Sequence, residues 1–497
     1  MKRNTCESKA SGCTGARSRP PSSTRHSRRA GPSSRSSDRR LSMNITKHIA
    51  EYVTASDIED FPPDAIEAAK GAIMDCLACM LAGSGESLAD ILCRYVAAES
   101  ASPAASVVGR AFRTSAANAA LVNGAMGHAL DYDDITQITK THPTTVLLPA
   151  SLAVAEEVGA SGKDMLLGYL TGFEVACAVG EALSEAYYDD LGWHPTGPLG
   201  AVGAAAAASK IMALDSERTA MAVSLAASQA SGLRQNFGTM TKPFHAGDSA
   251  RAGVVAAKLV RDGFTASDDA LEGRFGFIRA FSGGEGFDSD QVTQNLGKKL
   301  YMVESGIEVK KYPCCGSAHL ALDATFDLLS QSAIDPEAVE RIDVMVDFDP
   351  PRSLIHSRPL SSLEGKFSIQ YCLAAALLDR RVGLQSFTDD QVMRPEAQAL
   401  IPRIDMRRIP GNEGQPSWTE GYHQVDVQMK DGSTLRQQAH RANSGALRGV
   451  TMDDIREKFR DCASQLLSEA TTAELLSRLD SLEDGEPVSG LADLLRT

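Results

Sequence analysis

The stretch GPLGAVGAAAAAS, residues 197–209, indicates how this chain packs. It contains no charged residue and consists mostly of alanine and glycine. The stretch is shorter than the roughly 20 apolar residues that span a bilayer, and alanine is only weakly hydrophobic. A buried helix whose small side chains let neighbouring helices approach closely is the better interpretation. We therefore expect a mainly α protein and no membrane partner.

The composition is that of an ordinary soluble protein. The 497 residues are 43% hydrophobic, 23% charged and only 5% aromatic, which is typical of two or three globular domains. The net charge of −14 argues against a nucleic-acid partner. Ten cysteines without even spacing do not form a disulfide framework, and they favour a reduced, cytoplasmic protein.

The first 42 residues differ from the rest. They hold nine Arg and two Lys against Glu7 and Asp38, and they almost lack apolar residues. No apolar run of a secretory signal is present, and the amphipathic pattern of a mitochondrial presequence is missing. We expect residues 1–42 to be a disordered tail, or to be untranslated if Met43 is the true start, with a targeting role as the third alternative.

Helical periodicity dominates from about Met43 to about Tyr301. Apolar and small residues recur at helical spacing in several segments. These are residues 64–83, 115–134, 144–159, 162–183 and 215–233. Asp215 is a plausible N-cap of the last segment. The pattern predicts one large all-helical domain.

The pattern changes near Gly306. Residues 339–348 alternate as a strand does, and residues 423–438 read as a hairpin turning at Asp431-Gly432. Helical patterns lie between these strands, and the chain returns to helix at its end. The predicted fold is therefore mainly α: a helical domain of residues 43–304 plus 444–497, with a smaller α+β lid, residues 305–443, inserted into it.

Polar residues followed by proline and a small-residue helix recur in this sequence. His142-Pro143, His194-Pro195 and Lys242-Pro243 each stand at such a point. Helix N-termini carry unpaired N–H groups and partial positive charge. Several such ends, if they converge, form a pocket for carboxylates, in which histidines supply acid and base groups. Each His-Pro is also compatible with a purely structural turn.

The stretch KYPCCGSAH, residues 311–319, is the densest in chemistry. Adjacent Cys314 and Cys315 fit neither the C-x₂₋₄-C spacing of zinc sites nor a redox C-x-x-C. His319 is a weak candidate base for a nucleophilic cysteine. A shaped turn that delivers Lys310 and the Cys315/His319 side into a cleft is the preferred interpretation. Because no nucleotide or metal motif stands in a supportive context, we expect no cofactor and no metal.

Six segments in this order resemble the successive signatures of the MmgE/PrpD family, and the resemblance runs from about Met43 to the end. The segments are GHALDYDD (127–134), THPTTVLLPA (141–150), GWHPTGPLGAVGAAAAASK (192–210), TKPFHAGDSARAG (241–253), EGRFGF (272–277) and KKYPCCGSAH (310–319). The resemblance implies 2-methylcitrate dehydratase, cis-aconitate decarboxylase and related activities on small polycarboxylates. It also implies a helical domain with a smaller lid, homodimers and no cofactor.

By the same resemblance, the site contains Asp131, His142, His194, Lys242, Lys310 and Tyr371. We expect Lys242, Lys310, His194 and Cys315 to bind substrate. His142 or His319 moves the proton, Asp131 orients an imidazole, and Tyr371 protonates a leaving hydroxyl or the carbanion. In the decarboxylase branch a histidine resembles the position held here by Cys315, and one residue fewer separates the counterparts of Asp131 and His142. These departures favour a dehydratase or hydratase of the 2-methylcitrate type.

Three alternatives stay open. The first is a decarboxylase of the cis-aconitate type, and the second is an epimerase or isomerase acting at the carbon α to a carboxylate. The third is a family member that binds a metabolite without catalysis. A binder needs the charges of Lys242 and Lys310 but not the titrating pair His142 and His194, which argues for an enzyme.

Overall fold

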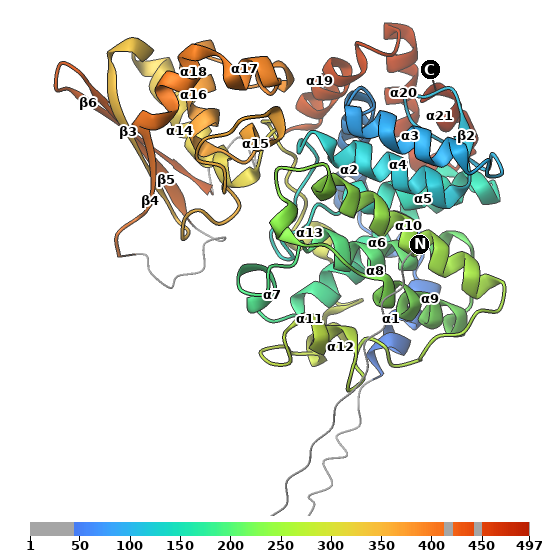
Figure 1. The fold of residues 1–497 in the computed structure, drawn as a ribbon. Helices are drawn as coiled ribbons and strands as arrows, with labels where there is room; N and C mark the ends of the chain where they lie inside the picture. The colour runs from blue at the N-terminus through green and yellow to red at the C-terminus, as the bar shows by residue number, and fades with distance from the viewer. Residues whose placement is uncertain (1–43, 412–420, 442–449, 497) are drawn as a thin grey trace, which may run out of the picture. The chain divides into compact units, whose positions relative to one another are not determined.

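The computed structural model describes residues 44–411, 421–441 and 450–496. The protein is mainly α (Figure 1). The expected tail, residues 1–42, lies outside the described residues. Within the described ranges no single helix is both long and apolar enough to cross a membrane. Residues Pro63–Gly83 and Ser87–Ala98, two helices that meet at an 87° bend, reach that length and composition only as a pair.

The first part of the chain is a layered stack of helices. Its long helices are α1 (Ile45–Ala55), α2 (Pro63–Gly83), α3 (Ser87–Ala98), α4 (Ala116–Ala129), α5 (Thr144–Val158), α6 (Gly162–Glu181), α8 (Thr196–Ile211), α9 (Ser216–Gln229) and α10 (Thr241–Arg261). Short helices follow or intervene: α7 (Ala186–Asp189), α11 (Phe277–Phe281), α12 (Asp290–Asn295) and α13 (Tyr301–Glu304). Helix α10 packs on both α4 and α8 at the centre of the stack.

Glycine makes the central helices approach closely. A Cβ at Gly247 in α10 would lie 2.0 Å from the carbonyl oxygen of Leu121 in α4. A Cβ at Gly203 in α8 would lie 2.8 Å from the carbonyl oxygen of Gly172 in α6. Real side chains do not tolerate such contacts, so these backbones are nearly touching. The expectation that small residues lie between neighbouring helices is confirmed.

The expectation of an all-helical first domain is wrong in one place. Strands β1 (Ala105–Ser106) and β2 (Arg113–Thr114) form a small antiparallel ribbon within it. Gly109 lies between them with φ +66°, a left-handed conformation that suits glycine and reverses the chain. The ribbon is too short to show an alternating pattern in the sequence.

The second part of the chain builds a four-stranded sheet, β4-β3-β5-β6. The strands are β3 (Val339–Val346), β4 (Ile404–Arg408), β5 (Tyr422–Met429) and β6 (Thr434–His440). The hairpin prediction is confirmed: β5 and β6 pair antiparallel, and Gly432 in the turn has φ +88°. Helices cover one face of the sheet (Figure 1). Helices α14 (His319–Gln331) and α16 (Ile369–Asp379) contact its strands. The short helices α18 (Pro395–Leu400), α17 (Asp389–Met393) and α15 (Ser362–Gly365) continue from α16, each packed on the one before.

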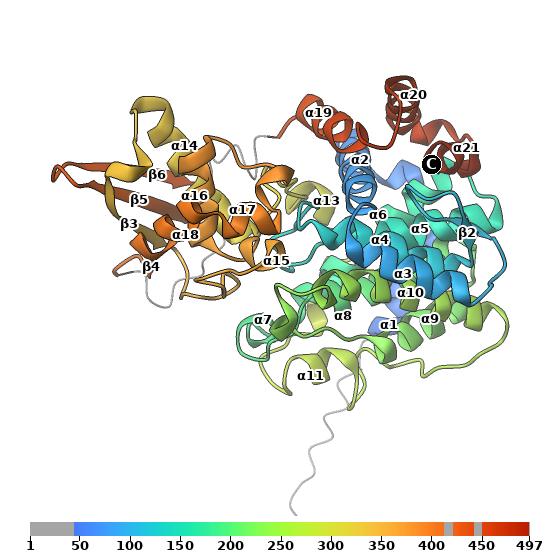
Figure 2. The same ribbon diagram turned by 45° about the horizontal axis from the view of Figure 1, so that its top comes forward.

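The chain ends in helices α19 (Met452–Ala463), α20 (Glu469–Asp480) and α21 (Val488–Leu494). Helix α19 packs against α2, and both views show them side by side (Figure 2). These terminal helices share one hydrophobic core with the first helical stack, whereas the sheet and its helices have a second core. By contacts, residues 43–497 form one unit. The predicted domain limits stay a prediction, and the one at 443/444 lies outside the described residues.

Candidate active site

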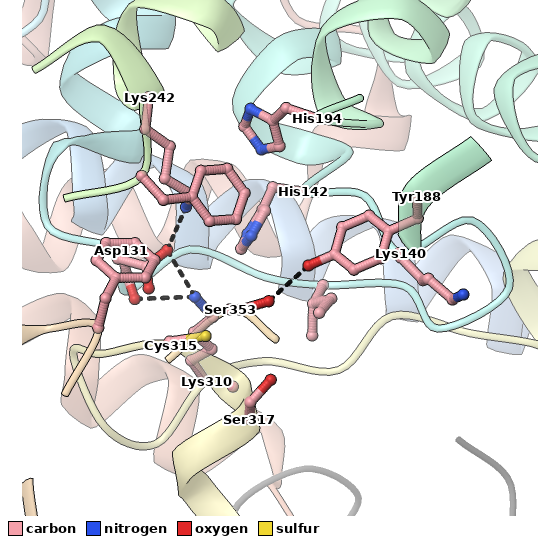
Figure 3. Close-up of a pocket in the computed structure, with 14 residues that line it drawn as sticks. Asp131, Lys140, His142, Tyr188, His194, Lys242, Lys310, Cys315, Ser317 and Ser353 are labelled. Atoms are coloured by element: carbon pink, nitrogen blue, oxygen red, sulfur yellow. Dashed lines mark hydrogen bonds and ion pairs between the residues drawn. The ribbon is translucent and has the colours of Figure 1, made fainter. Parts of the chain in front are cut away.

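One small cavity brings together most of the residues that the sequence singled out (Figure 3). It has a volume of about 40 Å³. The predicted residues that line it are Asp131, His142, His194, Lys242, Lys310 and Cys315. His142 and His194 precede α5 and α8, and Lys242 lies in the first turn of α10. The predicted convergence of three helix N-termini is therefore present.

Asp131 is the electrostatic centre of the cavity. The expected helix 115–134 ends earlier, at Ala129, and Asp131 turns the chain with φ +50°. Its Oδ1 accepts from Lys242 Nζ at 2.6 Å and lies 3.0 Å from Lys310 Nζ. Both lysines are almost fully buried. One carboxylate oxygen therefore holds two ammonium groups side by side.

The charges in this trio support each other. Burial opposes ionisation of Asp131, but Lys242 and Lys310 hold the pKa of its carboxyl well below its usual range. Burial alone would lower the pKa of Lys310, but Asp131 and Asp133 outweigh it and raise that pKa. Asp131 thus stays an anion, and Lys310 stays a cation at neutral pH.

His142 has a defined tautomer. Its Nδ1 lies 2.8 Å from the backbone carbonyl of Asp134, which can only accept, so Nδ1 carries the proton. Nε2 is left as the basic nitrogen. Burial lowers the pKa of His142 to about 3, and Lys310 and Lys242 act in the same direction. Asp134 also caps α5, because its carboxylate accepts from the backbone N–H and hydroxyl of Thr144.

Three further histidines, His128, His194 and His245, lie close together next to His142. His128 Nδ1 lies 2.8 Å from a carboxylate oxygen of Asp133, and its ring centroid is 4.5 Å from that of His142. His194 Nδ1 lies 3.1 Å from Nδ1 of His245. Burial lowers the pKa of His128 and His194, and of His245 to about 4. These imidazoles are neutral at pH 7.

The spacing of His128, His142 and His194 is close enough for shared metal ligation, because their nitrogens lie within 4.8 Å of one another. Asp131, Asp133, His128 and His142 form a second group of this kind. Burial is the main cause that lowers the pKa of the three imidazoles, and Lys242 acts in the same direction, whereas Asp133 opposes it at His128 and His142. The ammonium groups of Lys242 and Lys310 are the fixed positive charges that line the cavity.

The two adjacent cysteines have different surroundings. Cys315 lines the cavity, and burial followed by the nearby Asp131 raises the pKa of its thiol. Cys314 points into the second core, where burial and Cys372 raise the pKa of its thiol. At neutral pH both are thiols rather than thiolates, so Cys315 can offer a proton rather than act as an activated nucleophile.

Two sequence-predicted catalytic residues do not line the cavity. His319 is fully buried in the second part of the chain, where Nε2 donates to the Cys314 carbonyl at 3.2 Å. The hydroxyl of Tyr371, also fully buried, donates to the Ser386 carbonyl. The His319 Nε2 and the Tyr371 hydroxyl thus have backbone partners, whereas His319 Nδ1 has no hydrogen-bond partner among the described residues, and both catalytic assignments stay predictions.

The structure adds residues that the sequence did not indicate. Tyr188 and Ser353 line the cavity, and their hydroxyls lie 2.6 Å apart. The guanidinium of Arg234 lies 3.8 Å from the centre of the Tyr188 ring. Phe237 and Phe367 flank Lys242, with ring centres 5.3 and 5.2 Å from its Nζ. His128 and Asp133 stood in a quoted motif, but Tyr188 and Ser353 gave no signal.

Comparison with known proteins identifies the family. The MmgE/PrpD N-terminal domain matches residues 47–290, and the MmgE/PrpD C-terminal domain matches residues 312–483. The chain belongs to the MmgE/PrpD family. It is 29% identical to cis-aconitate decarboxylase of Homo sapiens over 466 residues, which covers 91% of this chain and 95% of that protein.

Similar relatives occur in other organisms. Cis-aconitate decarboxylase of Mus musculus is 28% identical, covering 91% of this chain and 93% of the relative. Cis-aconitate decarboxylase of Aspergillus terreus is 26% identical, covering 93% and 97%. The similarity therefore includes both the helical part and the sheet-containing part of the family fold.

Proposed function

We propose that this protein is a lyase that acts on a small polycarboxylate of the cis-aconitate type. The observation that carries the proposal is the buried trio Asp131, Lys242 and Lys310 beside the bare Nε2 of His142. Two fixed cations in a water-poor cavity bind carboxylates and stabilise negative charge on the neighbouring carbon. The named activity of the relatives supports the same substrate class.

The lysines serve as the anion-binding groups. Each ammonium has three N–H donors, and one donor of each lysine points to Asp131 Oδ1. Lys310 also donates to the Asp131 carbonyl at 3.0 Å. The remaining donors can meet substrate carboxylates without moving the lysines. Preorganised charge of this kind lowers a barrier by several kcal/mol, because nothing has to reorient when the carbanion forms.

His142 becomes a useful acid–base group once substrate binds. Lys310 and Lys242 help to keep its pKa at about 3. Substrate carboxylates between the lysines and the imidazole cancel part of that field, so the pKa of His142 rises toward its ordinary value near 6.5. The substrate thus tunes the imidazole that exchanges the proton with it.

Decarboxylation is the first reaction to consider. The carbon–carbon bond to one carboxylate breaks, CO₂ leaves, and the electron pair remains on the carbon as an allylic carbanion. That carbon then takes a proton, and the step needs no oxidant or reductant. Cys315, a neutral thiol, and His142 are cavity groups that can deliver the proton. All three relatives described above are named for this reaction.

Dehydration or hydration, as in 2-methylcitrate dehydratase, is the second candidate. Hydroxyl groups of Tyr188, Ser317 and Ser353 line the cavity and suit a leaving hydroxyl group. The volume of about 40 Å³ holds only a few water molecules. Acids of six or seven carbons, such as cis-aconitate and 2-methylcitrate, therefore require the predicted lid to open. We also propose a homodimer located in the cytoplasm.

The test is product analysis by ¹H NMR after incubation with cis-aconitate and, separately, 2-methylcitrate. We expect CO₂ loss from cis-aconitate or interconversion of 2-methylcitrate with its dehydrated form. Solvent deuterium entering the substrate without net conversion indicates the epimerase or isomerase alternative.

The variant His142→Asn separates catalysis from binding. We expect it to lose turnover while tricarballylate, a saturated tricarboxylate, still binds by calorimetry. A folded wild-type protein that converts neither acid and does not bind tricarballylate refutes the proposal. Binding without any turnover supports the non-catalytic alternative.

A further inference from the structure

Three successive backbone carbonyls at the Asp131 turn each accept a hydrogen bond from a different buried lysine. Lys366 donates to the Leu130 carbonyl at 2.7 Å. Lys310 donates to the Asp131 carbonyl at 3.0 Å, and Lys458 donates to the Tyr132 carbonyl at 2.7 Å. The three lysines come from separate parts of the chain, so the arrangement is not a local turn motif.

The outer two lysines also bind a second segment. Lys366 donates to the Pro313 carbonyl at 3.0 Å, and Lys458 donates to the Lys310 carbonyl at 3.1 Å. Each lysine therefore joins residues 130–132, which carry Asp131, to residues 310–313, which carry Lys310 and precede Cys315. We call Lys366 and Lys458 the two bridging lysines. In the first segment the two bridged carbonyls, those of Leu130 and Tyr132, stand on either side of Asp131 in the sequence.

The turn needs such support. Asp131 has φ +50°, a backbone conformation that costs a residue with a side chain about 1–2 kcal/mol. The three carbonyls follow the C-terminal end of α4, where partial negative charge accumulates. Buried carbonyls without a partner cost about 1–3 kcal/mol each. Cationic donors at this helix end satisfy the carbonyls and the dipole together.

We infer that Lys366 and Lys458 are positioning residues, which fix the distance between Asp131 and the segment carrying Lys310 and Cys315. The inference extends the proposed function and rests on it for its kinetic part. Neither bridging lysine lines the cavity in the described part of the chain, so neither touches the substrate. Both act through the two backbone segments that they join.

The two bridges differ in their charge balance. Lys458 pairs with Asp75 at 2.6 Å, and its ammonium lies 3.5 Å from the centre of the Tyr132 ring. Removing it leaves Asp75 buried without a cation, which costs several kcal/mol. Lys366 makes no ion pair among the described residues, and burial lowers its pKa to about 8. Lys366 is therefore the cleaner site for substitution.

The experiment uses Lys366→Met, which keeps the length of the side chain and removes its donors. Peptide mass spectrometry measures the rate at which iodoacetamide alkylates Cys315 in the full chain. Cys177, buried in α6, is the internal control for global unfolding. We expect alkylation of Cys315 to rise about tenfold and that of Cys177 to stay unchanged. Lys366→Arg, which keeps a cationic donor, should restore the wild-type rate.

Kinetics supply the second readout. In Lys366→Met, kcat should fall about tenfold to a hundredfold, while the dissociation constant for tricarballylate changes less than threefold, because the lysines that bind carboxylates remain. The exposed neighbour Lys311 gives the control Lys311→Met, which should match wild type in both measurements.

The outcomes separate the two proposals. Unchanged alkylation of Cys315, or an equal rise at Cys177, overturns the positioning role. Absence of turnover in wild type refutes the proposed function but leaves the alkylation result to decide the inference. If Lys366→Met does not fold, the paired variant Lys458→Met with Asp75→Leu removes the other bridge without leaving a buried charge.

Discussion

Lowering the pH from 8 to 5 should remove the stability that His142 and His245 contribute as neutral buried imidazoles. Burial lowers the pKa of His142 to about 3 and that of His245 to about 4. In the unfolded chain each imidazole has its ordinary pKa near 6.5. Between these values the unfolded state binds more protons than the folded state. The contribution of the two histidines is therefore complete above about pH 6.5 and declines as the pH falls, whereas Glu174, whose pKa burial raises to about 7, contributes with the opposite sign.

The size of the effect follows from the two pKa values. At pH 5 an imidazole with a folded pKa of about 3 or 4 costs about 2 kcal/mol relative to neutral pH. His142 and His245 together cost about 4 kcal/mol by the same relation. For a chain of this size, about 1 kcal/mol changes the melting temperature by roughly 1 °C. Asp131 and Asp133, whose pKa values lie well below their usual range, gain no protons in this window.

The assay compares the melting temperature of wild type and His245→Gln from pH 8 to pH 5. His245 does not line the cavity in the described residues, so its substitution leaves the proposed ligands in place. Wild type should lose about 2 °C more than the variant across this range. Saturating tricarballylate should reduce the pH dependence of the wild-type melting temperature, because it raises the pKa of His142. Parallel profiles for the two proteins would falsify the reasoning.

Three further predictions follow from the cavity and the core. Lys310→Met should lower kcat/KM for the substrate by about 10²–10³, measured by steady-state kinetics, and a change below threefold contradicts its role. Tyr188→Phe and Ser353→Ala should each weaken closure of the cavity, and their double-mutant cycle on kcat/KM should show about 1 kcal/mol of coupling; additive effects contradict this contact. Gly247→Ala should destabilise the helical core by about 1–3 kcal/mol in thermal unfolding. Gly85→Ala should not, because a Cβ at Gly85 would lie 3.6 Å from its nearest neighbour, the carbonyl oxygen of Ala82. Equal effects of the two substitutions contradict the packing argument.

Sequence reasoning located the cavity because its signals are local. A polar residue, a proline and a run of small residues mark a helix N-terminus wherever the chain folds. His142, His194 and Lys242 each stand at such an end, and their convergence followed from the shared preference for an anion. Alanine and glycine likewise indicated the helical core, because small side chains in a helix allow another helix to pack closely against it.

His319 lies outside the cavity lining for a geometric reason. Cys315 and His319 are four residues apart, a spacing that places two side chains on one face only if the helix is continuous. The chain instead forms a 3₁₀ turn at Gly316–Ala318, and α14 begins at His319. The change in helical period sends Cys315 to the cavity and His319 into the second core. No propensity in the sequence marks that change.

The hydrogen-bond acceptors of the two bridging lysines could not be predicted from the sequence either. Lys366 and Leu130 are 236 residues apart, and Lys458 and Tyr132 are 326 residues apart. Their contacts are with backbone carbonyls, which every residue has, so no residue type identifies the acceptor. A buried lysine in the sequence looks like any surface lysine until the fold shows where its ammonium lies.

The charge balance of the cavity predicts that a polycarboxylate should bind more tightly than a monocarboxylate. Asp131 is one anion shared by two buried cations, and its Oδ2 has no hydrogen-bond partner within the described residues. The neutral imidazoles behind it add donors and acceptors but no charge. Among the groups that line the cavity, Asp131, Lys242 and Lys310 carry one positive charge in excess, which a single substrate carboxylate offsets, and Asp133 adds a buried negative charge beside His142. Lys140, which lies 3.7 Å from Asp189, is a further cation at the edge of the cavity. Affinity should therefore depend on how many carboxylates reach Lys242, Lys310 and Lys140 together, rather than on the apolar surface of the ligand.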